Sequence, residues 1–150
     1  VMDVVNKLNE FRDSLNISLI GVPLWERLDN IDITQLDNLK TISFESSYID
    51  YESDEVQDFI YNFRQHYSTD PGKYGFAGYD ITWYFINAIN MFGAHFADCL
   101  INLETDNYSG DMWFRKSFID NSSYENTHWN IIQYGNFSKR KIYLYPRDIE

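Results

Sequence analysis

The chain has 150 residues, of which 44% are hydrophobic and 18% aromatic, so it can bury a core and does not have the composition of a disordered chain. Its 12 basic and 23 acidic residues give a net charge of −11, which argues against binding nucleic-acid phosphates or an anionic membrane surface. No segment approaches the roughly 20 apolar residues of a membrane span, so membrane insertion is not expected. The single Cys99 excludes an internal disulfide framework and any multi-cysteine metal site.

The first third of the chain alternates between helix-like and strand-like patterns. Apolar residues at helical spacing predict a helix over residues 1–15. The short apolar run 17–22, ended by Pro23, is typical of a strand buried on both faces. Residues 26–39 are polar with spaced Leu and Ile, which indicates a short helix and a loop, and residues 40–50 read as a second strand.

A further helix is predicted over the stretch 52–68. Ser53 or Asp54 is placed to cap it, and the acidic residues of its first turn suit the helix dipole. The Asp70-Pro71-Gly72 stretch ends it. Helix and strand therefore alternate through the first 70 residues, which predicts a parallel sheet with crossover helices.

Residues 74–93 carry seven aromatic rings and predict a long helix that continues to about residue 96. Its rings form two stripes, and a helix that is apolar on most faces is buried between layers. Core packing is therefore the first explanation of the rings. Tyr79 and Asp80 fall in the first turn, where unpaired backbone N–H groups can face a cleft, so Tyr79 is also a candidate for a cleft role.

The C-terminal part contains three strand-like runs, at residues 111–118, 127–135 and 140–146. Polar turns at residues 120–126 and 135–139 separate them. Short strands joined by such turns predict an antiparallel meander.

One group of carboxylates raises an alternative function. Glycoside hydrolysis uses paired carboxylates, and cation sites also use carboxylate oxygens. The candidate residues are Asp50, Glu52, Asp54 and Glu55. A loop followed by a helix N-terminus also explains this acidic cluster, and we favour that interpretation.

Other catalytic signals are weak. The three histidines, at positions 66, 95 and 128, lack the spacing of metal ligands. The sequence contains no G-x-S-x-G motif, no Gly-rich phosphate loop and no Cys beside an obvious base. We therefore predict that the chain is not an enzyme and uses no cofactor and no metal.

Several stretches resemble type 1 periplasmic binding proteins. The segment FRQHYSTDPGKYGFAGYDITWYFINAINMFGAHF resembles the family's aromatic-small-Gly-Tyr-Asp entry to a long helix. SLIGVPLWERL resembles the preceding strand with its Gly-x-Pro-x-Trp loop, and SSYIDYESDEVQDFIYNFRQHY resembles the strand and helix between them. The closing strands, including NIIQYG, also look like that family. The resemblance is closest to branched-chain amino-acid receptors, especially envelope proteins in which this domain follows LysM peptidoglycan-binding repeats.

The resemblance implies an α/β fold in which a flavodoxin-like, three-layer parallel sheet precedes the antiparallel meander. Residues 1–150 would be a single domain, the C-terminal part of the family's fold. Residues 1–70 would supply part of an α/β lobe, and residues 74–150 the aromatic helix and meander. The implied function is a non-catalytic ligand-binding module of the bacterial periplasm or cell envelope, which binds an amino acid or a cell-wall fragment at the hinge.

Matched residue by residue, the resemblance implies that Tyr79 and Trp25 contact the ligand, with Glu26 and Tyr48 nearby. The family segments that grip the ligand's α-carboxylate and amine have no counterpart in the chain. The alternative is therefore a structural or protein-interaction domain that has lost the small-molecule site.

Val1-Met2 reads as the middle of a helix, so we expect a piece excised from a longer chain. Unpaired strand edges and an exposed aromatic stripe would then favour self-association. We expect a homo-oligomer whose interface includes Phe85, Ile89, Phe92 or Phe96.

Overall fold

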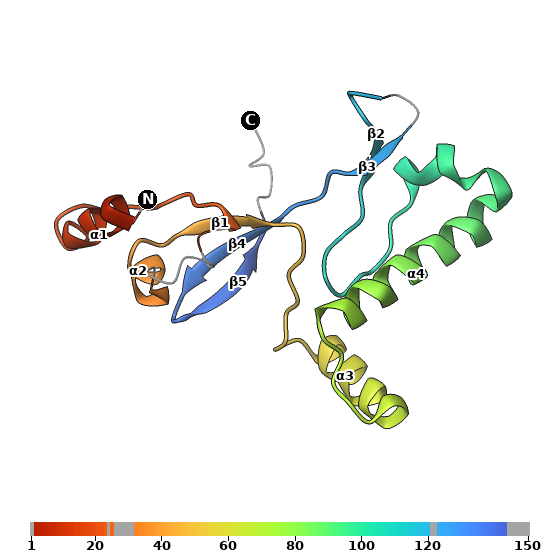
Figure 1. Cartoon of the computed structure of the whole chain (residues 1–150), viewed down its shortest axis with the longest axis horizontal. Helices are drawn as coiled ribbons and strands as arrows, with labels where there is room; N and C mark the ends of the chain where they lie inside the picture. Colours follow the sequence, from red (N-terminus) through yellow and green to blue (C-terminus); the bar gives the residue numbers. More distant parts are fainter. Residues whose placement is uncertain (1, 24, 26–31, 121–122, 144–150) are drawn as a thin grey trace, which may run out of the picture. The chain divides into compact units, whose positions relative to one another are not determined.

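The computed structural model describes residues 2–23, 25, 32–120 and 123–143 (Figure 1). The chain divides into two compact units. Unit 1 comprises Val1–Glu45 and Asn130–Glu150, and unit 2 comprises Ser46–Trp129. The division that the sequence predicts near residue 70 falls inside unit 2.

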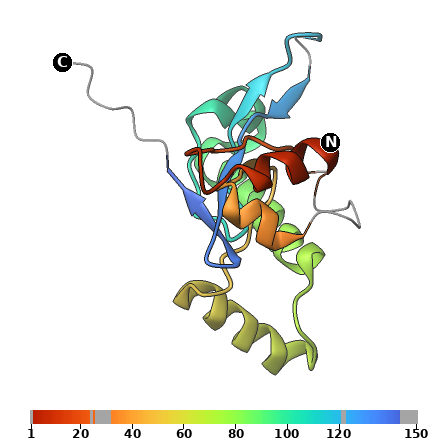
Figure 2. The same cartoon turned by 90° about the vertical axis from the view of Figure 1, so that its left-hand side faces the viewer.

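Unit 1 places two helices with a three-stranded sheet. The helices are α1 (Met2–Glu10) and α2 (Ile33–Asn38), and the strands are β1 (Ile42–Glu45), β4 (Asn130–Gly135) and β5 (Ser138–Ile142). The strand order is β1-β4-β5, and both pairings are antiparallel. α1 and α2 lie side by side in Figure 2, and α2 also contacts β4. The buried apolar side chains of this unit are Val5, Leu36, Leu39, Ile132 and Tyr134.

A tight turn joins β4 to β5. Gly135 pairs with Ser138, so Asn136 and Phe137 are the two turn residues. Their φ angles are 55° and 58°, as in the type I′ turn that matches the twist of a hairpin. This turn lies within residues 135–139, where the sequence predicts one.

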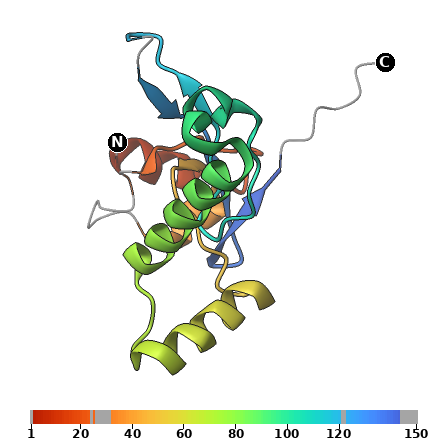
Figure 3. The same cartoon turned by 90° about the vertical axis from the view of Figure 1, so that its right-hand side faces the viewer.

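Unit 2 contains α3 (Asp54–Tyr67), α4 (Lys73–Phe92), the 3-10 segment η2 (Gly93–Asn102) and a hairpin of β2 (Phe114–Lys116) and β3 (Tyr124–Asn126). Figure 3 shows α4 continuing into η2. Gly93, at φ 70°, is the residue at which the α-helix ends, because a left-handed backbone favours glycine.

Two clusters of buried side chains hold unit 2 together. Val56 and Ile60 of α3 pack with Phe76 of α4, together with partly buried Phe59 and Tyr108. The second cluster joins α4 to η2 and the segments around it. Its buried members are Tyr84, Ala88, Leu100 and Leu103.

The two long predicted helices are confirmed. α3 ends at Tyr67, and the Ser53 hydroxyl caps it by accepting a hydrogen bond from Val56 N at 3.3 Å. The aromatic helix is α4, which stops at Phe92 rather than near residue 96. Apolar spacing is a local signal for both helices, and a capping side chain adds to it in α3 alone, because the N-cap of α4 is Gly72.

The predicted flavodoxin-like parallel sheet is wrong. Within the described residues, every strand pairing is antiparallel, and the only parallel feature is a single bridge from Ile20 to Ile42. Ile20 and Val22 are 67% and 53% exposed, so the run 17–22 is not a strand buried on both faces. β4, from the far end of the chain, pairs with β1. The chain therefore does not have the expected periplasmic-binding-protein-like fold. Its described residues form two small antiparallel sheets together with helices.

The predicted C-terminal meander is confirmed for its last two runs, which pair antiparallel as β4 and β5, and is wrong for the run at residues 111–118. β3 forms at Tyr124–Asn126, inside the stretch 120–126 expected as a turn, and it pairs with β2. The second neighbour of β4 is β1 rather than β2. The strand-like runs thus belong to two separate sheets, because pairing depends on contacts that the local pattern does not encode.

Candidate ligand-binding pocket

Unit 2 contains a pocket of about 490 Å³. Ligand pockets commonly measure about 300–1,000 Å³, so this one has room for a small organic molecule. α4 contributes Trp83 and Asn87 to its lining. The remaining lining residues are Glu104, Thr105, Asp106, Asp111, Met112 and Trp113.

The segment 103–113, here called the U-loop, supplies most of the lining. In Figure 1 the chain leaves η2, runs to the first half of α4 and returns toward β2. Glu104 to Asp106 belong to the outgoing arm, and Asp111 to Trp113 to the returning arm. Gly110, at φ 133°, lies where the chain reverses and uses a backbone conformation that favours glycine.

Asp80 ties the tip of the U-loop to α4. Its side chain is fully buried. Its Oδ1 accepts a hydrogen bond from Tyr108 N at 2.9 Å, and its Oδ2 accepts from Ser109 N at 2.8 Å and from Ser109 Oγ at 2.5 Å. A buried carboxylate is stable only when donors surround it, and these three donors meet that need. Ser109 O in turn accepts from Tyr48 N at 2.8 Å.

The spacing along α4 links this anchor to the pocket. Asp80, Trp83 and Asn87 stand at i, i+3 and i+7, which places them on one side of the helix. The same side that holds the loop tip therefore presents the pocket residues. Tyr84, the residue after Trp83, is fully buried, and its hydroxyl donates a hydrogen bond to Leu100 O at 3.2 Å.

Other rings contact both indoles of the pocket. Trp83 stacks on Tyr79, with ring centroids 6.4 Å apart and planes 14° apart. Trp113 meets the buried His128 ring edge-on, with centroids at 4.7 Å. The two indoles are nevertheless 43% and 52% exposed, so both present surface to a ligand.

Tyr108, at the loop tip, joins this aromatic network. Its ring lies 5.4 Å from Tyr79 and 4.8 Å from Phe59. Burial, followed by the neighbouring Tyr79 and Asp80, raises the pKa of Tyr108. Its phenol therefore stays neutral through the physiological range.

The pocket is acidic. Glu104, Asp106 and Asp111 contribute three carboxylates, and its eight lining residues include no Lys, Arg or His. His128 Nδ1 lies 3.9 Å from Asp111 Oδ2.

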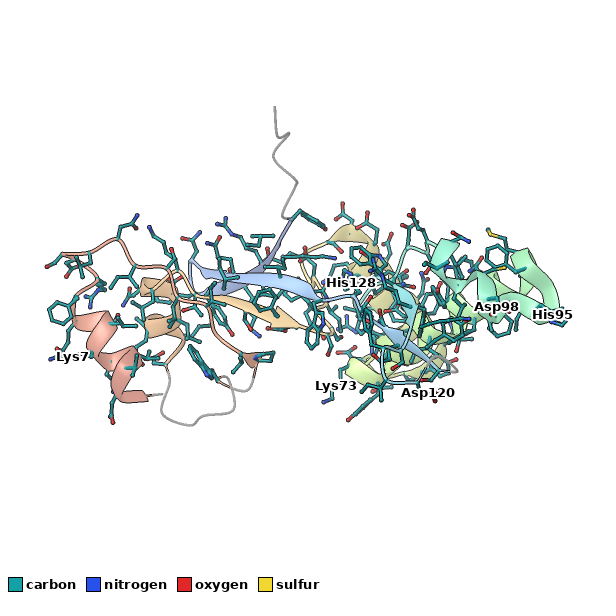
Figure 4. All side chains as sticks on the ribbon, turned by 90° about the horizontal axis from the view of Figure 1, so that it is seen from above. Lys7, Lys73, His95, Asp98, Asp120 and His128 are labelled. Atoms are coloured by element: carbon teal, nitrogen blue, oxygen red, sulfur yellow. The ribbon has the colours of Figure 1, made fainter. Side chains whose placement is uncertain are left out.

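No metal centre is found in the part of the chain that the structure describes, since no group of three or more His, Cys, Asp or Glu side chains there could hold an ion. Figure 4 shows His95 at the outer end of η2, well away from His128. Among the same residues, no helix combines the length and apolarity needed to cross a bilayer.

The four residues predicted to contact a ligand have different outcomes. Trp25 lies in unit 1, half-buried against Gly21, where an added Cβ would come within 2.8 Å of the indole. Glu26 lies outside the described residues. Tyr48 and Tyr79 lie in unit 2 but do not line the pocket. Each contacts a residue next to the pocket or in it. Tyr48 N donates a hydrogen bond to Ser109 O at the tip of the U-loop, and the Tyr79 ring stacks on the lining residue Trp83.

Sequence reasoning missed the residues that do line the pocket. Trp83 reads as part of a core stripe and Trp113 as part of a strand. A usable signal lies in the stretch ETDNYSGDMW, residues 104–113, where three acids and an indole accompany a glycine. Such a segment is too polar for a core and therefore marks an exposed loop that carries ligand-type side chains.

Comparisons of the chain with protein-family models, with curated proteins and with solved structures find no match.

Proposed function

We propose that the chain is a non-catalytic ligand-binding module that takes a small molecule into the pocket between α4 and the U-loop. The observation that carries the proposal is the pocket itself, a space of about 490 Å³ with two indoles and several polar side chains in its lining. The indoles and Met112 offer apolar surface, and the five polar or charged lining residues can orient a ligand, which makes this lining more polar than that of most small-molecule sites.

The anchoring of the U-loop supports a pocket that exists before the ligand arrives. Asp80 fixes the loop tip through three hydrogen bonds, and α4 supplies the opposite lining. A ligand then loses less affinity to the ordering of the loop. The acidic cluster at Asp50–Glu55, which raises the glycosidase alternative, does not line this pocket.

The location in the bacterial envelope, and an amino acid or cell-wall fragment as ligand, rest on the family resemblance and stay predictions. A thermal-shift screen can identify a ligand without any assumption about its chemistry. The full chain is heated with amino acids, amines, sugars and muropeptide fragments at millimolar concentration. A ligand that binds only the folded state raises the melting temperature by mass action.

The site is then assigned with matched tryptophan variants. We expect Trp83→Ala and Trp113→Ala each to weaken a screened ligand by roughly tenfold or more, as buried aromatic contacts usually do. Trp129→Ala is the control, because Trp129 is 55% exposed and does not line the pocket. Circular dichroism verifies that each variant is folded. A screen without any hit, or hits that ignore both pocket variants, would refute the proposed function.

A further inference from the structure

We infer that the ligand of this pocket is an organic cation that carries an alkylammonium or guanidinium group. The inference rests on the proposed function and specifies the chemical class of its ligand. Three features of the pocket support it, namely its charge, its indoles and its size.

The charge of the lining selects the sign of the ligand. Glu104, Asp106 and Asp111 face a ligand without any basic side chain in the lining. The whole chain adds to this field, since its net charge is −11. An anionic ligand is repelled by both, whereas a cation is attracted to the site and held there by close carboxylates.

The indoles select the kind of cation. Tryptophan provides the best aromatic face for a cation, and alkylammonium and guanidinium groups are the cations that bind such faces. Trp83 and Trp113 come from two different elements, α4 and the U-loop, yet line the same pocket. Contacts with Tyr79 and His128 limit the movement of the two rings, and about half of each indole stays accessible.

The size and ligand set argue for an organic cation rather than a metal ion. A pocket of about 490 Å³ has the size of sites that take organic molecules, about 300–1,000 Å³, whereas Mg²⁺ and Ca²⁺ need oxygen ligands close around them, at about 2.0–2.6 Å. The lining includes the apolar Met112, which offers no hard oxygen ligand. Among the described residues, no three or more His, Cys, Asp or Glu side chains are grouped so that they could hold a metal ion.

The test compares charged probes with neutral molecules of the same shape. Binding of choline is measured against 3,3-dimethyl-1-butanol, and binding of ethylguanidinium against ethylurea, by calorimetry and tryptophan fluorescence on the full chain. We expect at least one cation to bind roughly tenfold or more tightly than its neutral partner, because only the cation gains the charge and ring interactions. Ionic strength is held at about 0.15 M, so that distant surface charges are screened.

Charge-neutralising variants locate the effect. Asp106→Asn and Asp111→Asn should each weaken the preferred cation by roughly threefold or more and leave its neutral partner unchanged. Glu52→Gln is the matched control, because it changes the net charge equally at an exposed position outside the pocket. An equal effect of Glu52→Gln would show that the attraction comes from the whole chain and would overturn the inference.

The remaining outcomes separate the inference from the proposed function. If neutral partners bind as tightly as the cations, or if the screen finds only neutral or anionic ligands that depend on Trp83 and Trp113, the organic-cation inference is wrong and the proposed function stands. If no probe and no screened compound binds at millimolar concentration, both are wrong.

Discussion

At Asp80, both oxygens of a fully buried carboxylate accept hydrogen bonds from the tip of the U-loop. Asp80 does not line the pocket, yet it sets the position of the two loop arms that do. α4 begins at Lys73, so Tyr79 and Asp80 lie in its second turn and not in the first turn where the sequence predicts them. Its role is structural, because its contacts are backbone N–H groups and a serine hydroxyl within the same chain.

Replacement of Asp80 by Ala should destabilise unit 2 by about 3 kcal/mol, since it leaves buried N–H groups without an acceptor. Urea titration followed by tryptophan fluorescence measures the loss. The same variant should weaken any pocket ligand although Asp80 does not touch it. Asp58→Ala, at an exposed site on α3, serves as the control. A stable Asp80→Ala variant with unchanged ligand affinity would remove Asp80 from this role.

Tyr84 gives the protein a predictable response to alkaline pH. Burial raises the pKa of Tyr84, so the folded state favours its neutral form. The unfolded pKa is about 10, so this contribution is complete below pH 10 and is lost as the pH rises from there through the folded pKa.

We therefore expect the stability of unit 2 to fall above about pH 10. Tyr84→Phe should cost about 1 kcal/mol at neutral pH, through the lost bond to Leu100 O, and should make the alkaline decline shallower. Urea titrations between neutral and alkaline pH measure both effects. The control is Tyr61→Phe, since Tyr61 is exposed. An unchanged alkaline slope in Tyr84→Phe would contradict the assignment.

Among the elements, the β4–β5 hairpin contains an identifiable local strain. Phe137 occupies the second turn position at φ 58°. The residue is 66% exposed, so little burial of its side chain offsets the cost of this conformation. A left-handed backbone costs a side chain with a Cβ about 1–2 kcal/mol. Asn136, the other turn residue, tolerates this conformation better.

Substitution of Phe137 by Gly should stabilise unit 1 by about 0.5–1 kcal/mol, because the relief of strain exceeds the entropy that glycine adds to the unfolded chain. Thermal and urea unfolding measure the change. Asn136→Gly should give a smaller gain. A loss of stability in Phe137→Gly would show that the ring packs favourably and that the turn is not strained.

For the whole molecule, self-association remains a proposal, and fewer of the residues predicted for its interface are still candidates. Phe85, Phe92 and Phe96 pack partly buried against the cluster of Tyr84 within the same chain. Ile89 remains 50% exposed, and Ile81, two turns earlier on α4, is 49% exposed. Exposed apolar residues on one helix face favour contact with a second copy.

Sedimentation equilibrium at micromolar concentration tests this proposal. We expect an apparent mass above the 17.9 kDa of one chain, and a shift to 17.9 kDa in the double variant Ile81→Lys, Ile89→Lys. Lys7→Ala on α1 is an exposed control outside unit 2. A wild-type chain that sediments at 17.9 kDa across the concentration range would rule out self-association through α4.

The sequence by itself determined the elements whose signals are local. Ser53 and the apolar stripe after it predict α3, the ring-rich stretch predicts α4, and the polar residues 135–139 predict the hairpin turn. Helix and turn hydrogen bonds join residues only a few positions apart, so their patterns can be read from a short window.

Only the tertiary structure decided the sheet and the pocket. β1 could pair with an early strand or a late one, and it pairs with β4, whose residue Gln133 lies opposite Ile42. The pocket exists because Asp80 binds Tyr108 and Ser109, 28 and 29 positions along the chain. Strand pairing and buried polar contacts of this kind depend on which distant segments meet, and the closure of such long loops is not encoded in any local period.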